Sequence, residues 1–350
     1  MSTAVKHISP DRIHFSQSLT GSEIGELRSN DRMRVLQTAG PVDSRTWVAL
    51  NERLFAHRPD VQLRLYGFYQ EACDLSFLWA MTNVQRFAAD CLISARNVDA
   101  IGRLPRLRDL SVGIFELESL RFLEDVPPSL EKLFIGQTRS KRPDLAVLER
   151  FGSLRSIYVE GQNKNIEVLE KLQSLEDVTL RSISARDLTF LRRLPKMWSL
   201  DIKLGGCKDL SALSGHLGIK YLELWQVLGL HDLGPVSSLP NLQYLYLQSL
   251  RQVRALPDLS RLTRLRRIYL ENMKNLEDLS ALDRAPALAE FIHVGASRHN
   301  PDDYLPLLKN TSVRRVRIGF GSDRKNAAFD ELARPFGKEK YDFTPFEFSN

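Results

Sequence analysis

A repeated six-residue pattern constrains this chain more than any other feature of its sequence. The hexamer has apolar residues at its first, fourth and sixth positions, as in Leu242, Leu245 and Leu247, and it returns 23 residues later at Leu265. A constant offset between such hexamers is typical of repeat proteins, in which similar units stack along one axis. The function of a stack of this kind is expected on the surface that its units share.

The repeat extends over most of the chain. After an irregular first unit, which contains Leu63 and Leu65, the hexamers begin at Val84, Leu107, Leu130, Leu154, Leu175, Met197, Ile219, Leu242, Leu265, Leu288 and Val313. The steps between these positions all lie between 21 and 25 residues. Because side chains alternate between the two faces of a strand, each hexamer predicts a short strand with its apolar residues in the core. The array therefore has about 12 units.

A second signal recurs between the hexamers. Asp-Leu followed by a small residue begins at Asp74, Asp144, Asp187, Asp209, Asp232, Asp258 and Asp278. Asp and Ser cap short helical turns, and the leucine of each motif is predicted to point back into the stack. Each unit is thus expected to contain a strand, a turn and a brief helical or 3₁₀ return.

The two signals together resemble the short leucine-rich repeats, of about 22–23 residues, of bacterial internalin-like proteins. The match covers roughly residues 60–319. This resemblance implies an α/β solenoid, a horseshoe with a parallel β-sheet on its concave face. The family usually has Asn or Cys three residues after the last leucine of the hexamer, whereas this chain has other residues there. They are Phe115, Ile183, Gly205, Val227, Leu250 and Met273, so the turns are expected to pack through apolar contacts.

The flanks of the array are predicted to be caps, with an N-terminal capping region at 1–59, the repeat array at 60–320 and a C-terminal capping helix and tail at 321–350. Asp43–His57 has a capping residue and the apolar spacing of a helix, and so does Ser322–Arg334. Tyr341–Phe348 is rich in aromatic residues. A free segment of this kind would expose large apolar side chains, so we expect it to pack in the cap; a partner-binding arm is the alternative.

Composition narrows the class of protein. The 350 residues include 49 basic and 43 acidic side chains, a mixed surface with a net charge of only +6. The three cysteines, Cys73, Cys91 and Cys207, form no Cys-x-x-Cys pair and are expected to be reduced and buried, which favours a cytoplasmic protein. The sequence shows no signal peptide and no apolar run of about 18 residues, so no membrane association is expected.

The sequence contains no recognisable enzyme motif. The seven histidines are scattered, and none has a metal-ligand spacing. Gly-x-Ser-x-Gly, P-loop and dinucleotide fingerprints are absent, so we predict a non-enzymatic protein without cofactor or metal. His293 replaces the third apolar residue of its hexamer and is interpreted as a core histidine. Asp302 and Asp303 follow Pro301 at the start of a predicted helix, where carboxylates favour the helix dipole.

The outward positions of neighbouring hexamers form columns on the sheet. Five aromatic residues fall on three adjacent strands, and charged residues stand among them. Exposed Tyr, Trp and Arg carry most of the binding energy in protein interfaces. The predicted partner-binding residues are Trp198, Tyr221, Glu223, Trp225, Tyr244, Tyr246, Arg266, Arg267, Tyr269 and Glu271. The alternative is that these aromatics only stabilise the strands.

Three hypotheses of function follow. The first is a protein-binding module that captures a partner of unknown identity on its concave face; by resemblance it is an immunity or inhibitor protein against a toxin, or a secreted effector. The second is nucleic-acid binding through two basic groups, which are Arg314, Arg315, Arg317, Arg324 and Lys325, and Arg261, Arg264, Arg266 and Arg267. The small basic excess disfavours it. The third is a scaffold that assembles with copies of itself.

Overall fold

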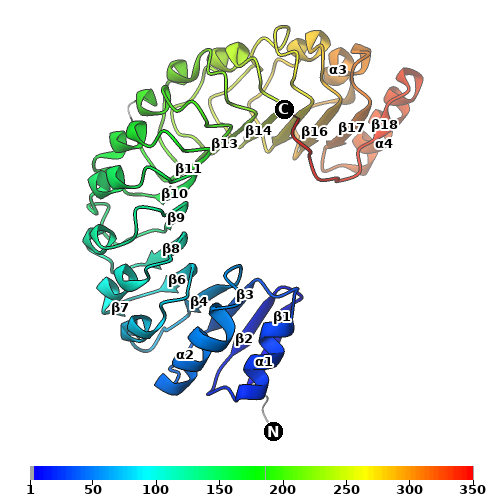
Figure 1. Cartoon of the computed structure of the whole chain (residues 1–350). Coiled ribbons are helices and arrows are strands. Elements are labelled where there is room, and N and C mark those ends of the chain that lie inside the picture. The colour runs from blue at the N-terminus through cyan, green and yellow to red at the C-terminus, as the bar shows by residue number, and fades with distance from the viewer. Residues whose placement is uncertain (1–3, 186, 350) are drawn as a thin grey trace. The chain divides into compact units, whose positions relative to one another are not determined.

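The computed structural model describes residues 4–185 and 187–349, in two compact units, Met1–Leu175 and Glu176–Asn350. Within each unit, strands stack side by side in chain order, with short helical segments between them (Figure 1). Residues 1–3 and 350, which the predicted caps include, lie outside the described residues.

The strands of the first unit pair in chain order. All neighbouring pairs are parallel except the antiparallel pair β1 and β2. Their bounds are β1 Val5–Ser9, β2 Arg12–Phe15, β3 Val35–Thr38, β4 Gln62–Tyr66, β6 Arg86–Leu92, β8 Asp109–Ile114, β9 Lys132–Ile135 and β10 Ser156–Glu160. Two further short strands, β5 Cys73–Asp74 and β7 Ala95–Arg96, pair separately.

The strands of the second unit are all parallel to their neighbours. They are β11 Asp177–Arg181, β12 Ser199–Lys203, β13 Tyr221–Trp225, β14 Tyr244–Gln248, β15 Arg267–Glu271, β16 Glu290–Val294, β17 Arg315–Gly319 and β18 Glu339–Lys340.

Short helical segments return the chain from one strand to the next. The α-helices are α1 Gly21–Ser29, α2 Ser44–Leu50, α3 Leu305–Lys309 and α4 Asp323–Ala333, and the π-helical η1 Asn51–Phe55 follows α2 directly. The 3₁₀ segments are η2 Ser76–Ala80, η3 Val98–Arg103, η4 Arg121–Glu124, η5 Leu145–Arg150, η6 Ile166–Lys171, η7 Thr189–Leu191, η8 Ser211–Leu213, η9 Gly234–Ser238, η10 Ser280–Arg284, η11 Pro301–Tyr304 and η12 Arg334–Phe336.

Six of the seven Asp-Leu motifs begin a 3₁₀ return as the sequence predicted; after the seventh, at Asp258, the described chain passes to β15 through turns without a helical segment. In all seven motifs the Asp carboxylate accepts a hydrogen bond from the backbone N–H two residues later, at 2.7–3.1 Å. This bond satisfies one of the donors that a helical turn leaves unpaired at its start. The leucine of each motif is buried in the stack. A short polar cap and an apolar anchor thus recur in unit after unit.

Apolar side chains occupy the positions where the related family has Asn or Cys. Ile183, Val227, Leu250 and Met273 are buried, so the expected apolar packing of the turns is confirmed there. Phe115 departs from this expectation because it is exposed and lies under the guanidinium of Arg139, 5.7 Å from the ring centre. An exposed ring of this kind stabilises its turn through a cation–π contact and adds nothing to the core.

The predicted flanking helices are present. Asp43 caps α2, and its apolar face is buried against the first strands. Ser322 caps α4, where Phe329 is buried and Phe336, expected on the same face, is exposed. The first 59 residues also contain β1, β2 and β3, which extend the strand stack, although their sequence shows no hexamer. The boundaries of the caps stay a prediction.

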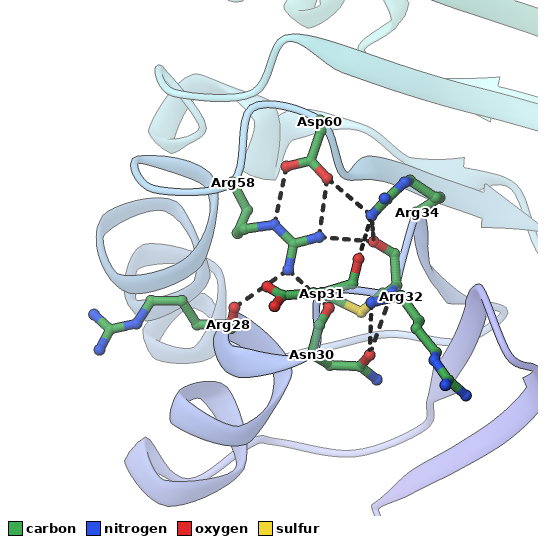
Figure 2. Close-up of polar contacts among 8 residues, drawn as sticks. Arg28, Asn30, Asp31, Arg32, Arg34, Arg58 and Asp60 are labelled. Atoms are coloured by element: carbon green, nitrogen blue, oxygen red, sulfur yellow. Dashed lines mark hydrogen bonds and ion pairs between the residues drawn. The ribbon is translucent and has the colours of Figure 1, made fainter.

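A polar network ties α1 to the start of β4 (Figure 2). Arg58 donates to both carboxylate oxygens of Asp60 at 2.9 Å. The same guanidinium donates to three backbone carbonyl oxygens, those of Arg28, Asn30 and Met33, at 2.8–3.2 Å. The carbonyl of Arg28 in the last turn of α1, and those of Asn30 and Met33 in the turn that follows, are held together by this one guanidinium.

Candidate functional site

The strand register of the second unit aligns the predicted columns. Glu223 on β13, Tyr246 on β14 and Tyr269 on β15 are register partners, and so are Trp225, Gln248 and Glu271. Alternate residues of these strands are buried, with the hexamer leucines in the core. We call the surface formed by the outward strand side chains of this unit the sheet face. Adjacent strands lie about 4.8 Å apart, which brings the predicted residues together.

The centre of the sheet face holds an aromatic patch, which we define as Trp225, Tyr246 and Tyr269. The rings of Tyr246 and Tyr269 lie 5.0 Å apart, in a tilted arrangement. The Tyr246 hydroxyl is 2.8 Å from Glu271 Oε2 and 3.0 Å from Gln248 Oε1, which fixes the ring. The three side chains are half-buried, so each still presents apolar surface. Rigid, partly exposed aromatics bind a partner at low cost in conformational entropy.

An ionic cluster, Asp201, Lys203 and Glu223, lies beside the patch. The Lys203 ammonium is 3.2 Å from Asp201 Oδ2 and 3.3 Å from Glu223 Oε2, and Tyr221 donates its hydroxyl to the same oxygen of Glu223 at 2.7 Å. Burial, and then the charge of Glu223, raises the pKa of Asp201 to about 6. Two carboxylates share one ammonium, so the cluster is net negative when both are ionised.

Two buried polar atoms near the patch have no hydrogen-bond partner in the part of the chain that the structure describes. They are Asp201 Oδ1 and Trp225 Nε1. The guanidinium of Arg181 covers the Trp225 ring at 5.4 Å and holds it in place. A buried polar atom without a partner costs about 1–3 kcal/mol.

The starts of the strands are covered by a segment from the end of the chain. This return segment, Tyr341–Ser349, follows β18, and Figure 1 draws it in dark red running back toward β14. Phe348 packs against Trp198 at 5.2 Å and Tyr221 at 6.1 Å, and Phe346 against Tyr244 at 5.1 Å. The guanidinium groups of Arg266 and Arg267 lie 4.7 and 4.9 Å from the ring of Phe346. Five of the ten predicted partner-binding residues therefore contact the return segment of the same chain.

Arg267 differs most from the sequence expectation. Its outward position predicted an exposed side chain, but it is only 5% exposed and pairs with Glu290 at 2.6 Å. Tyr244 and Tyr341 lie 5.3 and 5.1 Å from its guanidinium. The return segment causes this burial, and its position depends on contacts that no hexamer pattern contains. Arg267 thus holds the segment and is not a free contact residue.

The remaining chemistry-bearing residues are placed as follows. His293 is fully buried, which confirms the core interpretation. Asn300 and Asp303 form a capping box at the start of η11, where the sequence placed a helix start. Cys73 and Cys207 are buried free thiols, whereas Cys91 is exposed, contrary to expectation. Among the described residues, no group of three or more His, Cys, Asp or Glu side chains could hold a metal ion.

No helix in the described residues has the length and apolar character that crossing a membrane requires. No family model and no curated protein matches the chain.

Solved structures similar to this chain share its repeat architecture. An internalin, InlF, from Listeria monocytogenes is 14% identical, with a TM-score of 0.54 over 93% of this chain and 95% of the internalin. A leucine-rich repeat protein from Leptospira interrogans is 14% identical, with a TM-score of 0.52 over 95% of this chain and 90% of that protein. TLR13, solved in complex with ssRNA13, is 18% identical, with a TM-score of 0.55 over 88% of this chain and 46% of TLR13. These likenesses confirm the predicted fold, a leucine-rich repeat solenoid like that of the bacterial internalins.

Proposed function

We propose that this leucine-rich repeat chain is a non-enzymatic scaffold that binds a protein partner on the sheet face of its second unit. The observation that carries the proposal is the aromatic patch, three half-buried aromatic side chains beside the ionic cluster. The patch supplies rigid aromatic area, and the cluster supplies charge. Together these are the features of an interface hot spot.

The charge of the cluster indicates the chemistry of the partner. Asp201 and Glu223 share the ammonium of Lys203. A partner arginine or lysine placed over the cluster would be attracted by its two carboxylates. The expected partner surface is therefore basic.

Within this proposal, an immunity or inhibitor protein that neutralises a toxin is the role we favour, in keeping with a preformed binding surface and no recognised enzyme motif. The alternative role is that of a secreted effector, which would bind its target through the same sheet face. The free cysteines support a cytoplasmic location for the immunity role. Nucleic acid is disfavoured at this site because the carboxylates of the cluster repel phosphates.

The test is quantitative capture of a partner by two full-length variants. Replacement of Trp225, Tyr246 and Tyr269 by alanine should weaken capture by at least about 2 kcal/mol, roughly 30-fold in Kd. The matched control replaces two exposed aromatics of the first unit, Tyr69 and Trp79, by alanine. Affinity capture from the native host with mass spectrometry identifies the partner, and titration gives its Kd.

The control variant should bind like the wild type, and circular dichroism should show that both variants are folded. Equal capture of the same partner by the patch variant and the wild type would remove the sheet face from the proposal. Saturable binding of random duplex RNA or DNA that is weakened by salt would instead favour the nucleic-acid hypothesis.

A further inference from the structure

The return segment lies on the protein as a bound peptide does. After Tyr341 it has no regular secondary structure, and it passes over the starts of β15, β14 and β13 toward Trp198, which precedes β12. The hydrogen bonds between the segment and the strand starts link residues that are 77 to 129 positions apart in the chain. We call the surface beneath it, formed by the first residues of β13–β15 and the residues just before β12–β15, the strand-start surface.

The strand-start surface holds the backbone of the segment at three points. Arg267 Nη2 donates to the carbonyl oxygen of Thr344 at 3.2 Å, and Arg266 donates to that of Glu347. The Ser349 carbonyl accepts from Gln243 Nε2 at 2.7 Å and from Lys220 Nζ at 3.0 Å. Gln243 Oε1 in turn accepts from the Ser349 N–H at 2.8 Å. Backbone contacts of this kind suit any extended peptide, whatever its sequence.

Sequence preference comes from two aromatic positions. Phe346 lies between Tyr244 and the guanidinium groups, and Phe348 lies between Trp198 and Tyr221. One residue separates these two phenylalanines, so in an extended chain both side chains point to the same side. A peptide that fits must therefore place aromatic side chains at alternate positions.

Charge adds a second preference. The surface donates through cationic groups, those of Lys220, Arg266 and Arg267, and Arg317 lies 4.7 Å from the ring of Phe343. The segment itself carries Asp342 and Glu347. Opposite charges on the two partners favour association and specificity.

We propose that the strand-start surface is a binding site for an acidic, extended peptide with aromatic residues at alternate positions, and that the return segment occupies it in cis as a displaceable competitor. The inference rests on the proposed function in one respect, because five residues of the predicted partner-binding site lie under the segment. These five residues then belong to a peptide site that is distinct from the aromatic patch.

The attachment of the segment suits displacement. Phe343 and Phe348 remain 55% and 38% exposed, so neither ring is fully buried, although Tyr341 at the start of the segment is. A short connection to β18 gives the segment an effective concentration of about 1 mM at its own site. Even a weak intrinsic affinity then keeps the site occupied, while a peptide with tighter contacts replaces the segment.

The probe is a fluorescein-labelled peptide with the sequence of Tyr341–Ser349, and binding is followed by fluorescence anisotropy. The full-length variant F346A/F348A should release its segment and bind the peptide at least about 10-fold more tightly than the wild type, in which the segment competes. The same peptide with both phenylalanines replaced by alanine should not bind. Addition of W198A to the double variant should weaken binding again.

Two results would overturn the inference. One is no saturable binding to F346A/F348A up to about 1 mM peptide while its circular dichroism matches the wild type. The other is equal binding to wild type and double variant, which would place the peptide elsewhere. Neither result concerns the Trp225, Tyr246 and Tyr269 variant, so the proposed function stands or falls separately in the partner-capture experiment.

Discussion

Burial of His293 makes the core of the second unit sensitive to acid, in the same direction as the burial of His216 and His299. His293 occupies a position that is leucine in the two preceding hexamers, and its Nδ1 lies 2.8 Å from the Tyr304 hydroxyl. Burial, together with the neighbouring His299, lowers the pKa of His293 to about 3. Asp303 and Lys325 lie near His299. The ring stays neutral in the fold but takes up a proton near pH 6.5 in the unfolded chain. The free energy of unfolding should therefore fall as the pH drops below about 6.5.

We predict that His293→Leu flattens this acid dependence. Between pH 7 and pH 4.5 the wild type should lose roughly 2–3 kcal/mol more than the variant, because two pH units separate 4.5 from the unfolded pKa. Urea denaturation at both pH values measures the difference. His231→Leu is the control, since His231 is exposed and its removal should leave the slope unchanged. Parallel pH profiles for wild type and His293→Leu would contradict the assignment.

Single elements depend on contacts outside the repeat pattern. Helix α1 ends at Ser29, and the carbonyl groups of Arg28, Asn30 and Met33 accept from one guanidinium, that of Arg58. Asp60 holds this guanidinium in a two-bond contact, which also lowers the pKa of Asp60 through the hydrogen bond to Arg58 (Figure 2). A planar, forked donor is required because the acceptors diverge.

Arg58→Ala should therefore destabilise the first unit by about 2–3 kcal/mol, since it removes charge-assisted hydrogen bonds made by a guanidinium whose side chain is only 12% exposed. Arg34→Ala is the exposed counterpart, because Arg34 also pairs with Asp60, at 3.3 Å, and donates to the carbonyls of Asp31 and Met33, but from a side chain that is 54% exposed. Its loss should cost less than about 1 kcal/mol. Denaturant midpoints measure both. Equal losses for the two variants would show that the buried position of Arg58 adds no stability beyond that of an exposed arginine.

At the scale of the whole molecule, stability depends on contacts between neighbouring repeats. In a repeat array each repeat packs on the repeats beside it, so a local defect destabilises its neighbours first. Met273 follows β15 and is fully buried where the related family has Asn or Cys. Its side chain belongs to the apolar packing that joins adjacent turns.

Met273→Ala should cost about 2–5 kcal/mol and should be felt locally. Hydrogen exchange should quicken most in β14, β15 and β16 and least in β11 of the same unit. Lys274→Ala, which alters an exposed neighbour, serves as the control. A uniform increase in exchange rate along the whole second unit would mean that this unit unfolds in a single cooperative step.

The sequence by itself determined the architecture and the order of the columns. The hexamer spacing and the Asp-Leu caps are local patterns, and neighbouring strands align them without further information, as Tyr246 and Tyr269 show. Cys91 and Phe115 are exposed against expectation, because burial depends on the path of a particular turn and not on residue type.

Only the tertiary structure decided how the predicted site is divided. Lys220 and Ser349 are in contact although 129 positions separate them. No periodicity in the sequence places Phe346 on Tyr244 or Phe348 on Trp198. The return segment covers the strand starts and does not cover the aromatic patch, which lies farther along the strands. The position of an irregular segment depends on long-range packing. The repeats therefore predict the sheet surface. The return segment, which carries no repeat, decides which part of that surface the chain itself occupies.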